Sequence, residues 1–128
     1  MEIVKDWTGK SILIVEDDKF IAYIIEGFLK KTNAKLFVAT TGEEAVKIAL
    51  DVKPNLILMD IKLPGMSGFT ATKMIKENLS DTIIIAQTAF VSDSDRINAL
   101  ESGCTDFLPK PILREKLINL LGSFLDKI

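Results

Sequence analysis

The sequence predicts an α/β fold in which a parallel β-sheet is covered by helices on both faces. Short apolar runs alternate with segments of helical periodicity along the chain. Strands separated by helices connect through right-handed crossovers and therefore form a parallel sheet. The size also fits, because 128 residues, 48% of them hydrophobic and 27% charged, suit one domain with a closed core.

Five strands are predicted from the apolar runs, taken in order. The first covers residues 11–15 (SILIV) and the second covers residues 36–39 (LFVA). The third and fourth cover residues 55–59 (NLILM) and 82–86 (TIIIA), and the fifth is the short run at residues 105–108 (TDFL). The first, third and fourth runs are nearly continuous aliphatic stretches, which are typical of strands buried on both faces.

The first three helices are predicted from apolar stripes and capping residues. Residues 18–31 carry a stripe at helical spacing that runs from Phe20 to Leu29. Residues 41–44 (TGEE) are a capping-box signal that indicates the start of the second helix. A third helix is predicted over residues 68–78.

Start and stop signals define the last two helices. Ser92, followed by Asp95, indicates the start of the fourth helix, and Gly103 indicates its end. A second apolar stripe predicts the fifth helix from Leu113 onward, with Leu117, Leu120, Leu121, Phe124 and Leu125 on one face. The pattern is therefore five repeats of a strand followed by a helix.

One domain is predicted over residues 11–128, because no proline-rich stretch or low-complexity linker interrupts the pattern. Residues 1–10 (MEIVKDWTGK) form a polar lead-in that contains the only tryptophan, Trp7. This lead-in is either a terminus docked on the domain or the stub of a linker from a longer protein.

Composition excludes several classes of function. Sixteen basic and eighteen acidic residues give a net charge of −2, which does not favour direct binding of nucleic acid or of an anionic membrane. No apolar run has the length of a membrane span or the form of a signal peptide, and the single Cys104 cannot form an internal disulfide. We therefore expect a cytoplasmic protein with no membrane contact through this domain.

The sequence contains no histidine, which excludes a serine–histidine triad, a histidine-ligated zinc and a phosphohistidine carried by this chain. Any chemistry of this chain must therefore use carboxylates, hydroxyls or lysines, or a hard metal ion that oxygen atoms hold.

Reactive side chains follow four of the predicted strands, where open α/β sheets bind their ligands. They are Glu16 and Asp17 after the first strand, Asp60 after the third, Thr88 after the fourth and Lys110 after the fifth. If the first and third strands are neighbours, about 4.8 Å apart, the three carboxylates meet. A cluster that offers only oxygen atoms as ligands favours the binding of Mg²⁺. Asp60 could then attack phosphorus while Lys110 and Thr88 contact the phosphoryl oxygens.

Four motifs resemble the CheY-like receiver domain of two-component response regulators. They are IVEDD at residues 14–18, LMDIKLPGMSG at 58–68, AQTAF at 86–90 and FLPKP at 107–111. The resemblance covers about residues 8–128 and implies a flavodoxin-like, doubly wound sheet of five strands in the order 2-1-3-4-5. That order makes the first and third strands neighbours.

The resemblance also implies roles for the acidic residues. Asp60 matches the phosphoacceptor and Asp17 matches the principal metal carboxylate. Glu16 matches the acidic neighbour that holds Mg²⁺ directly or through water, and the backbone carbonyl of Lys62 completes the metal shell.

The remaining motif positions imply a conformational switch. Thr88 matches the switch hydroxyl, Phe107 the switch aromatic residue and Lys110 the lysine that contacts the phosphoryl group. The Lys110–Pro111 peptide bond is often cis in relatives.

Lys62 and Phe90 occupy positions that influence the lifetime of the phosphoryl group in the family. A bulky Phe90 should hinder the hydrolytic water, so we expect Phe90→Ala to lose its phosphoryl group faster than the wild type. Equal phosphoryl half-lives, measured by mass spectrometry after removal of the donor, would contradict this expectation.

The implied partner is a histidine kinase or phosphotransfer protein that donates its phosphoryl group. A downstream protein would bind the face made by the fourth helix, fifth strand and fifth helix, and the protein would be a monomer or a phosphorylation-dependent dimer. It would accept and lose its own phosphoryl group without turning over an external substrate.

Three other functions share part of this pattern. A dehalogenase-type phosphatase with an aspartate nucleophile requires a second acid where Lys62 stands. A flavodoxin-like electron carrier requires a phosphate loop where three acids follow the first strand. An interaction module independent of phosphorylation would not need the complete site.

The motifs look most similar to receivers joined to hybrid sensor histidine kinases, and the sequence DWTGK is similar to the linkers found there. The sequence leaves two origins open. One is a stand-alone regulator, and the other is the receiver of a hybrid kinase that acts as a phosphorelay intermediate.

Overall fold

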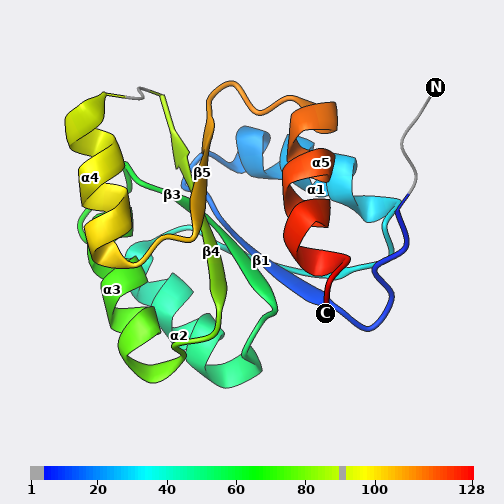
Figure 1. The fold of residues 1–128 in the computed structure, drawn as a ribbon, viewed down its shortest axis with the longest axis horizontal. Helices are drawn as coiled ribbons and strands as arrows, with labels where there is room; N and C mark the ends of the chain where they lie inside the picture. The colour runs from blue at the N-terminus through cyan, green and yellow to red at the C-terminus, as the bar shows by residue number, and fades with distance from the viewer. Residues whose placement is uncertain (1–4, 90–91) are drawn as a thin grey trace.

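A five-stranded parallel β-sheet lies at the centre of the protein, with helices on both faces (Figure 1). A computed structural model describes residues 5–89 and 92–128. In chain order its elements are β1 (Ser11–Val15), α1 (Lys19–Lys30), β2 (Lys35–Ala39), α2 (Gly42–Val52), β3 (Leu56–Asp60), α3 (Gly68–Asn78), β4 (Ile83–Thr88), α4 (Asp93–Ser102), β5 (Asp106–Pro109) and α5 (Arg114–Leu125).

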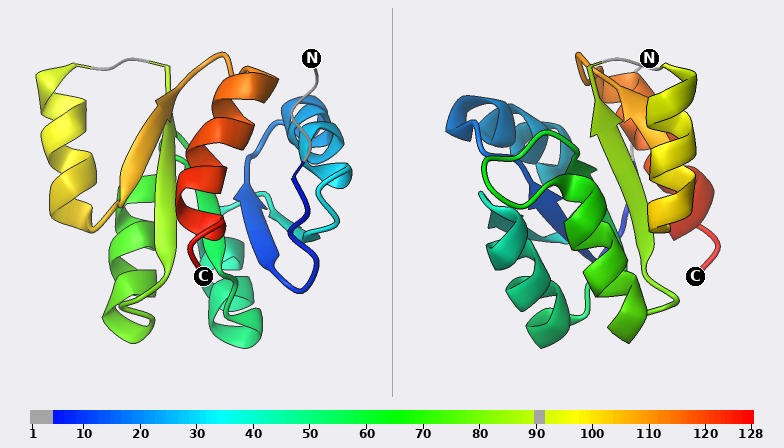
Figure 2. Two further views of the ribbon diagram at one scale, coloured as in Figure 1. Left: turned by 45° about the vertical axis from the view of Figure 1, so that its right-hand side comes forward. Right: turned by 90° about the vertical axis from the view of Figure 1, so that its left-hand side faces the viewer.

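The strand order is β2-β1-β3-β4-β5, and every pair of neighbours is parallel. The predicted fold class and the predicted order 2-1-3-4-5 are therefore confirmed. Because all strands point the same way, their carboxyl ends share one edge of the sheet, as the strand arrows in Figure 2 show. At this edge β1 and β3 are direct neighbours, with Val15 opposite Met59.

Two apolar layers bury the two faces of the sheet. Helices α1 and α5 cover one face, where Ile14, Leu58 and Ile85 pack against Ile25 and Leu121. Helices α2, α3 and α4 cover the other face, which is formed by the alternate residues of the same strands. All five residues of β3 are buried, which explains why its sequence is an unbroken apolar run up to Asp60.

Helix ends follow the capping signals of the sequence. The side chains of Asp18, Thr41 and Ser92 accept hydrogen bonds from the first turns of α1, α2 and α4. Gly103, with φ of 104°, ends α4 in the left-handed conformation that glycine favours. The predicted range of the third helix agrees with α3.

Strand ends differ from the prediction by one or two residues. The ladder of β3 continues to Asp60, and the ladder of β4 continues through Gln87 to Thr88. Backbone hydrogen bonds to neighbouring strands hold these polar residues in the sheet, and an apolar pattern cannot detect such bonds.

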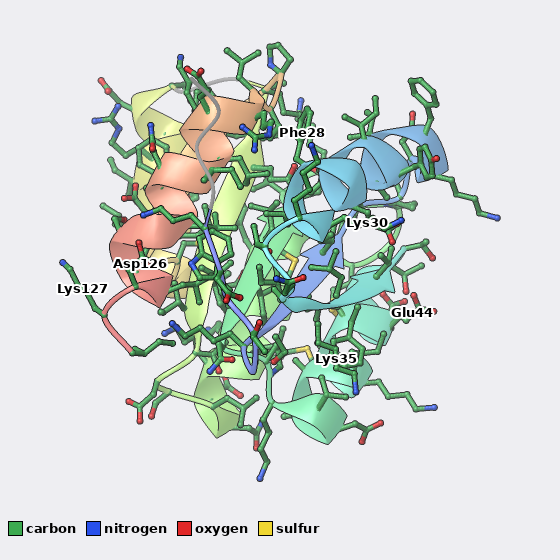
Figure 3. The ribbon with its side chains drawn as sticks, turned by 90° about the vertical axis from the view of Figure 1, so that its right-hand side faces the viewer. Phe28, Lys30, Lys35, Glu44, Asp126 and Lys127 are labelled. Atoms are coloured by element: carbon green, nitrogen blue, oxygen red, sulfur yellow. The ribbon has the colours of Figure 1, made fainter. Side chains whose placement is uncertain are left out.

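The segment before β1 is docked on the domain through Trp7, which is 1% exposed and packs in the core under α1 and α5. Its indole Nε1 donates to Asp126 Oδ1 at 2.8 Å. Lys5 Nζ also bonds Asp126, at 2.6 Å from Oδ2, and Lys10 Nζ donates to the carbonyl of Leu125. Figure 3 shows Asp126 at the end of α5, beside the N-terminal segment.

Trp7→Phe is expected to lower the free energy of unfolding by about 2 kcal/mol, because it removes a hydrogen bond to a charged group and part of a buried ring. Urea denaturation measures this change. Tyr23→Phe alters a ring that is 73% exposed and should leave stability within about 0.5 kcal/mol of the wild type. A similar loss in both variants would contradict the proposed importance of the docked indole.

No helix within residues 5–89 and 92–128 is both long enough and apolar enough to cross a membrane.

Candidate functional site

Three carboxylates meet at the carboxyl edge of the sheet. Glu16, Asp17 and Asp60 each offer one oxygen, and the three oxygens lie within 4.8 Å of one another. Glu16 and Asp60 are 1% and 3% exposed, whereas Asp17 is exposed. The pairing of β1 with β3 brings these residues together although more than forty positions separate them in the sequence.

Lys110 joins this cluster from the far side of β4. Its Nζ lies 3.1 Å from Asp60 Oδ2 and 3.5 Å from Glu16 Oε1. The backbone N–H of Lys110 donates to the carbonyl of Thr88 at 2.7 Å, and the Lys110–Pro111 peptide is cis. The ammonium group thus compensates part of the negative charge that is buried with the two carboxylates.

Backbone N–H groups orient the two buried acids. The N–H of Lys62 donates to Asp60 Oδ1 at 3.1 Å, and the N–H of Asp18 donates to Glu16 Oε2 at 3.1 Å. Each carboxylate therefore has one oxygen held by the backbone and the other facing Lys110.

The pKa of Glu16 is raised to about 7, first by burial and second by the neighbouring charge of Asp60, against the opposing effects of the Asp18 N–H and Lys110. Burial by itself would lower the pKa of Lys110. Its hydrogen bond and ion pair with Asp60, together with Glu16, outweigh that effect and raise the pKa above its ordinary value.

Without a metal ion, the free energy of unfolding is expected to fall by about 1–3 kcal/mol as the pH rises from 4.5 to about 7. The folded state binds more protons than the unfolded state in this window, because the pKa of Glu16 is raised on folding. Urea denaturation in the presence of a chelator, repeated across this range, measures the slope. Glu16→Gln should flatten it, and an unchanged slope in that variant would assign the pH dependence to other groups.

The chemistry of the cluster fits a hard divalent cation. Its donors are carboxylate oxygens, and Mg²⁺ prefers oxygen ligands in proteins. Two of the three acids are buried, so uncompensated negative charge there is unfavourable, and the one exposed acid leaves room for water ligands. The sequence prediction that these residues would converge is met by the geometry.

The two predicted switch residues lie on β4 and β5. Thr88 is the last residue of β4 and is 9% exposed. Phe107 pairs with Ala86 in β5, packs against the layer under α2, α3 and α4, and lies with its ring centroid 5.0 Å from Arg96 Cζ. Phe90 lies outside the described residues, so its influence on phosphoryl lifetime stays a prediction.

Sequence reasoning missed two features of the site. Gly68 lies so close to the carbonyl of Asp60 that a side chain there would collide with it. Gln87 is completely buried next to Asp60, although the sequence assigned it no role. The available signals were the glycine at the end of LMDIKLPGMSG and a polar residue within an aliphatic strand.

Comparison with known proteins supports the family resemblance that the four motifs indicated. Residues 12–122 match the family model described as the response regulator receiver domain. The polar-differentiation response regulator DivK of Brucella ovis is 34% identical over 118 residues, which cover 91% of this chain and 96% of DivK. Transcription factor SKN7 of Candida albicans is 35% identical over 114 residues, which cover 89% of this chain. The chain spans only 20% of the length of SKN7.

Solved structures agree with these relatives. One is the receiver domain of sensor histidine kinase PA1611 from Pseudomonas aeruginosa, with a magnesium ion coordinated in its active site cleft. It has a TM-score of 0.85 and 35% identity, over 93% of this chain and 99% of that one. The receiver domain of Saccharomyces cerevisiae Ssk1, solved with the histidine phosphotransfer protein Ypd1, has a TM-score of 0.87 and 32% identity, over 96% and 91% of the two chains. This chain belongs to the response regulator receiver domain family of two-component signalling systems.

Proposed function

We propose that Asp60 is the phosphoacceptor of this receiver and that its phosphorylation switches the surface of the domain. The observation that carries the proposal is the meeting of three carboxylates within 4.8 Å, with the Lys110 ammonium 3.1 Å from Asp60. Carboxylates with no role in phosphoryl or cation chemistry would gain little from such close burial.

Each residue of the site has a separate role in phosphoryl transfer. A carboxylate oxygen of Asp60 attacks the phosphorus of a phosphohistidine on a partner protein. The new P–O bond forms as the P–N bond breaks, and the electron pair of that bond stays on the imidazole of the donor. Lys110 and the hydroxyl of Thr88 contact the phosphoryl oxygens and stabilise their charge.

Glu16, Asp17, Asp60 and the backbone carbonyl of Lys62 would hold Mg²⁺. When bound, the ion would neutralise the acids and polarise the phosphoryl oxygens. The oxygen-only donor set supports this assignment, and so does the magnesium ion in the receiver domain of PA1611.

The donor is a histidine kinase or a phosphotransfer protein, and its phosphohistidine lies outside this sequence, which contains no histidine. The complex of the similar Ssk1 receiver with Ypd1 supports a donor of this kind. The domain turns over no external phosphate ester, so release of product from such an ester would contradict this part of the proposal.

The output is a change of the face formed by α4, β5 and α5. Phosphorylation of Asp60 draws Thr88 toward the phosphoryl group, and the half-buried Phe107 moves into the space that is released. Phe107 packs against the core layer that contains Ala99 of α4, and Thr88 ends the neighbouring strand β4, which supports a coupled movement.

Incubation with acetyl phosphate and Mg²⁺, followed by mass spectrometry of the intact protein, tests the proposal. We expect the mass to increase by one phosphoryl group, and we expect a chelator to prevent the increase. An unchanged mass in the presence of Mg²⁺ would overturn the assignment of Asp60 as phosphoacceptor.

A further inference from the structure

Gln87 is a buried carboxamide without a hydrogen-bond partner among residues 5–89 and 92–128. Its side chain is 0% exposed, and neither Nε2 nor Oε1 bonds another described atom. Buried polar groups are nearly always paired, and leaving one unpaired costs stability. A residue that keeps such a group in an otherwise aliphatic strand therefore points to a partner that it meets in another state of the site.

Strand register places Gln87 in the same row across the sheet as Asp60. Gln87 on β4 lies opposite Asp60 on β3 and opposite Leu108 on β5. Residues at matching register in parallel strands point to the same face of the sheet. The preceding row on this face contains Leu58 and Ile85, which belong to the core layer under α1 and α5.

Lys110 must pass over this row to reach the acids. It follows β5, whereas its Nζ lies 3.1 Å from Asp60 on β3, and β4 lies between these two strands. Neighbouring strands are about 4.8 Å apart, so the extended lysine side chain crosses the end of β4. Gln87 thus lies in the strand that the lysine side chain crosses, opposite the Asp60 that the lysine reaches.

The ammonium group and a divalent cation compete for the same carboxylates. Lys110 contacts Asp60 and Glu16, and both acids belong to the cluster that would hold Mg²⁺. Two positive groups at adjacent oxygens repel each other, and this repulsion is strong in a buried site. Uptake of the cation therefore favours another acceptor for Lys110, and a neutral amide oxygen can serve without adding a charge.

We propose that Gln87 is a positioning residue for Lys110, and that its Oε1 accepts a hydrogen bond from the ammonium group when a divalent cation takes Asp60 and Glu16. This inference rests on the proposed function, since it requires the cation site. It explains why a polar residue occupies a fully buried strand position. It also keeps Lys110 beside the acids, ready to contact the phosphoryl group that arrives on Asp60.

Gln87→Met tests the proposal, because methionine keeps the length of the side chain and lacks a strong acceptor. Isothermal titration calorimetry with Mg²⁺ alone should show binding about tenfold weaker than in the wild type. Metal-free stability in urea should be unchanged or higher, because the variant removes an unpaired buried amide. Lower metal-free stability with unchanged Mg²⁺ affinity would overturn the proposal, since it would show a purely structural role.

A double-mutant cycle with Lys110→Met shows whether Gln87 acts through the lysine. In the Lys110→Met background, Gln87→Met should change the Mg²⁺ affinity less than twofold. A tenfold loss in that background would overturn the proposal. Failure of the wild type to bind Mg²⁺ would overturn this inference and the metal site of the proposed function together. Normal binding by both the wild type and Gln87→Met would overturn this inference alone.

Discussion

Asp60→Asn is expected to abolish the mass increase that acetyl phosphate and Mg²⁺ produce in the wild type. The substitution keeps the size of the side chain but replaces a carboxylate nucleophile by an amide, which does not form a stable acyl phosphate. It also removes one of the three clustered carboxylates and the closer of the two acidic partners of Lys110. Intact-protein mass spectrometry should therefore detect no phosphoryl adduct in this variant.

Asp18→Asn is the matched control for this experiment. Asp18 belongs to the same acidic run, but it caps α1 through hydrogen bonds to Phe20 and Ile21 and lies outside the cluster of three carboxylates. Asparagine caps helices as well as aspartate does, so phosphorylation of this variant should equal that of the wild type. A phosphoryl adduct that persists in Asp60→Asn would show that another residue is the acceptor.

Gly68→Ala is expected to lower the free energy of unfolding by about 3 kcal/mol or more. A Cβ atom at this position would lie 2.1 Å from the carbonyl oxygen of Asp60 and 2.7 Å from the Cα of Ile61. Both atoms belong to the backbone, so the start of α3 or the end of β3 must move. Because the displaced segment carries the proposed acceptor, phosphorylation by acetyl phosphate should also slow.

Gly27→Ala is the opposite case and serves as the control. Gly27 lies in the interior of α1, and a Cβ atom there would meet nothing within 4 Å. Alanine favours helix more than glycine does, so this variant should be more stable by roughly 0.5–1 kcal/mol. Urea denaturation compares the two variants, and a small effect of Gly68→Ala would show that the loop after β3 adapts without strain.

The fold was predictable because its signals are local. Continuous aliphatic runs indicated β1, β3 and β4, and capping residues such as Thr41 and Ser92 marked helix starts that the structure confirms. Strand ends were less predictable. Asp60 and Thr88 are polar, yet backbone ladders hold them in β3 and β4.

The candidate site was predictable to the extent that its residues follow strands in recognisable motifs. Those motifs identified Asp60, Lys110 and the acids after β1, and the structure brings these side chains together. Gln87 and Gly68 were missed for a different reason. Their importance lies in burial and in close approach to other strands, and neither property has a signature in a single segment.

The sequence alone was sufficient to predict the alternating strands and helices and the residue types of the site. It also excluded histidine chemistry. Each of these properties depends on composition or on neighbours a few positions away. Tertiary structure alone decided that three carboxylates meet within 4.8 Å and that Trp7 is buried against α5. It also decided that Gln87, beside Asp60, has no hydrogen-bond partner within the described part of the chain. These facts depend on strand order, register and packing between distant segments. Such contacts exist only after the whole domain has folded.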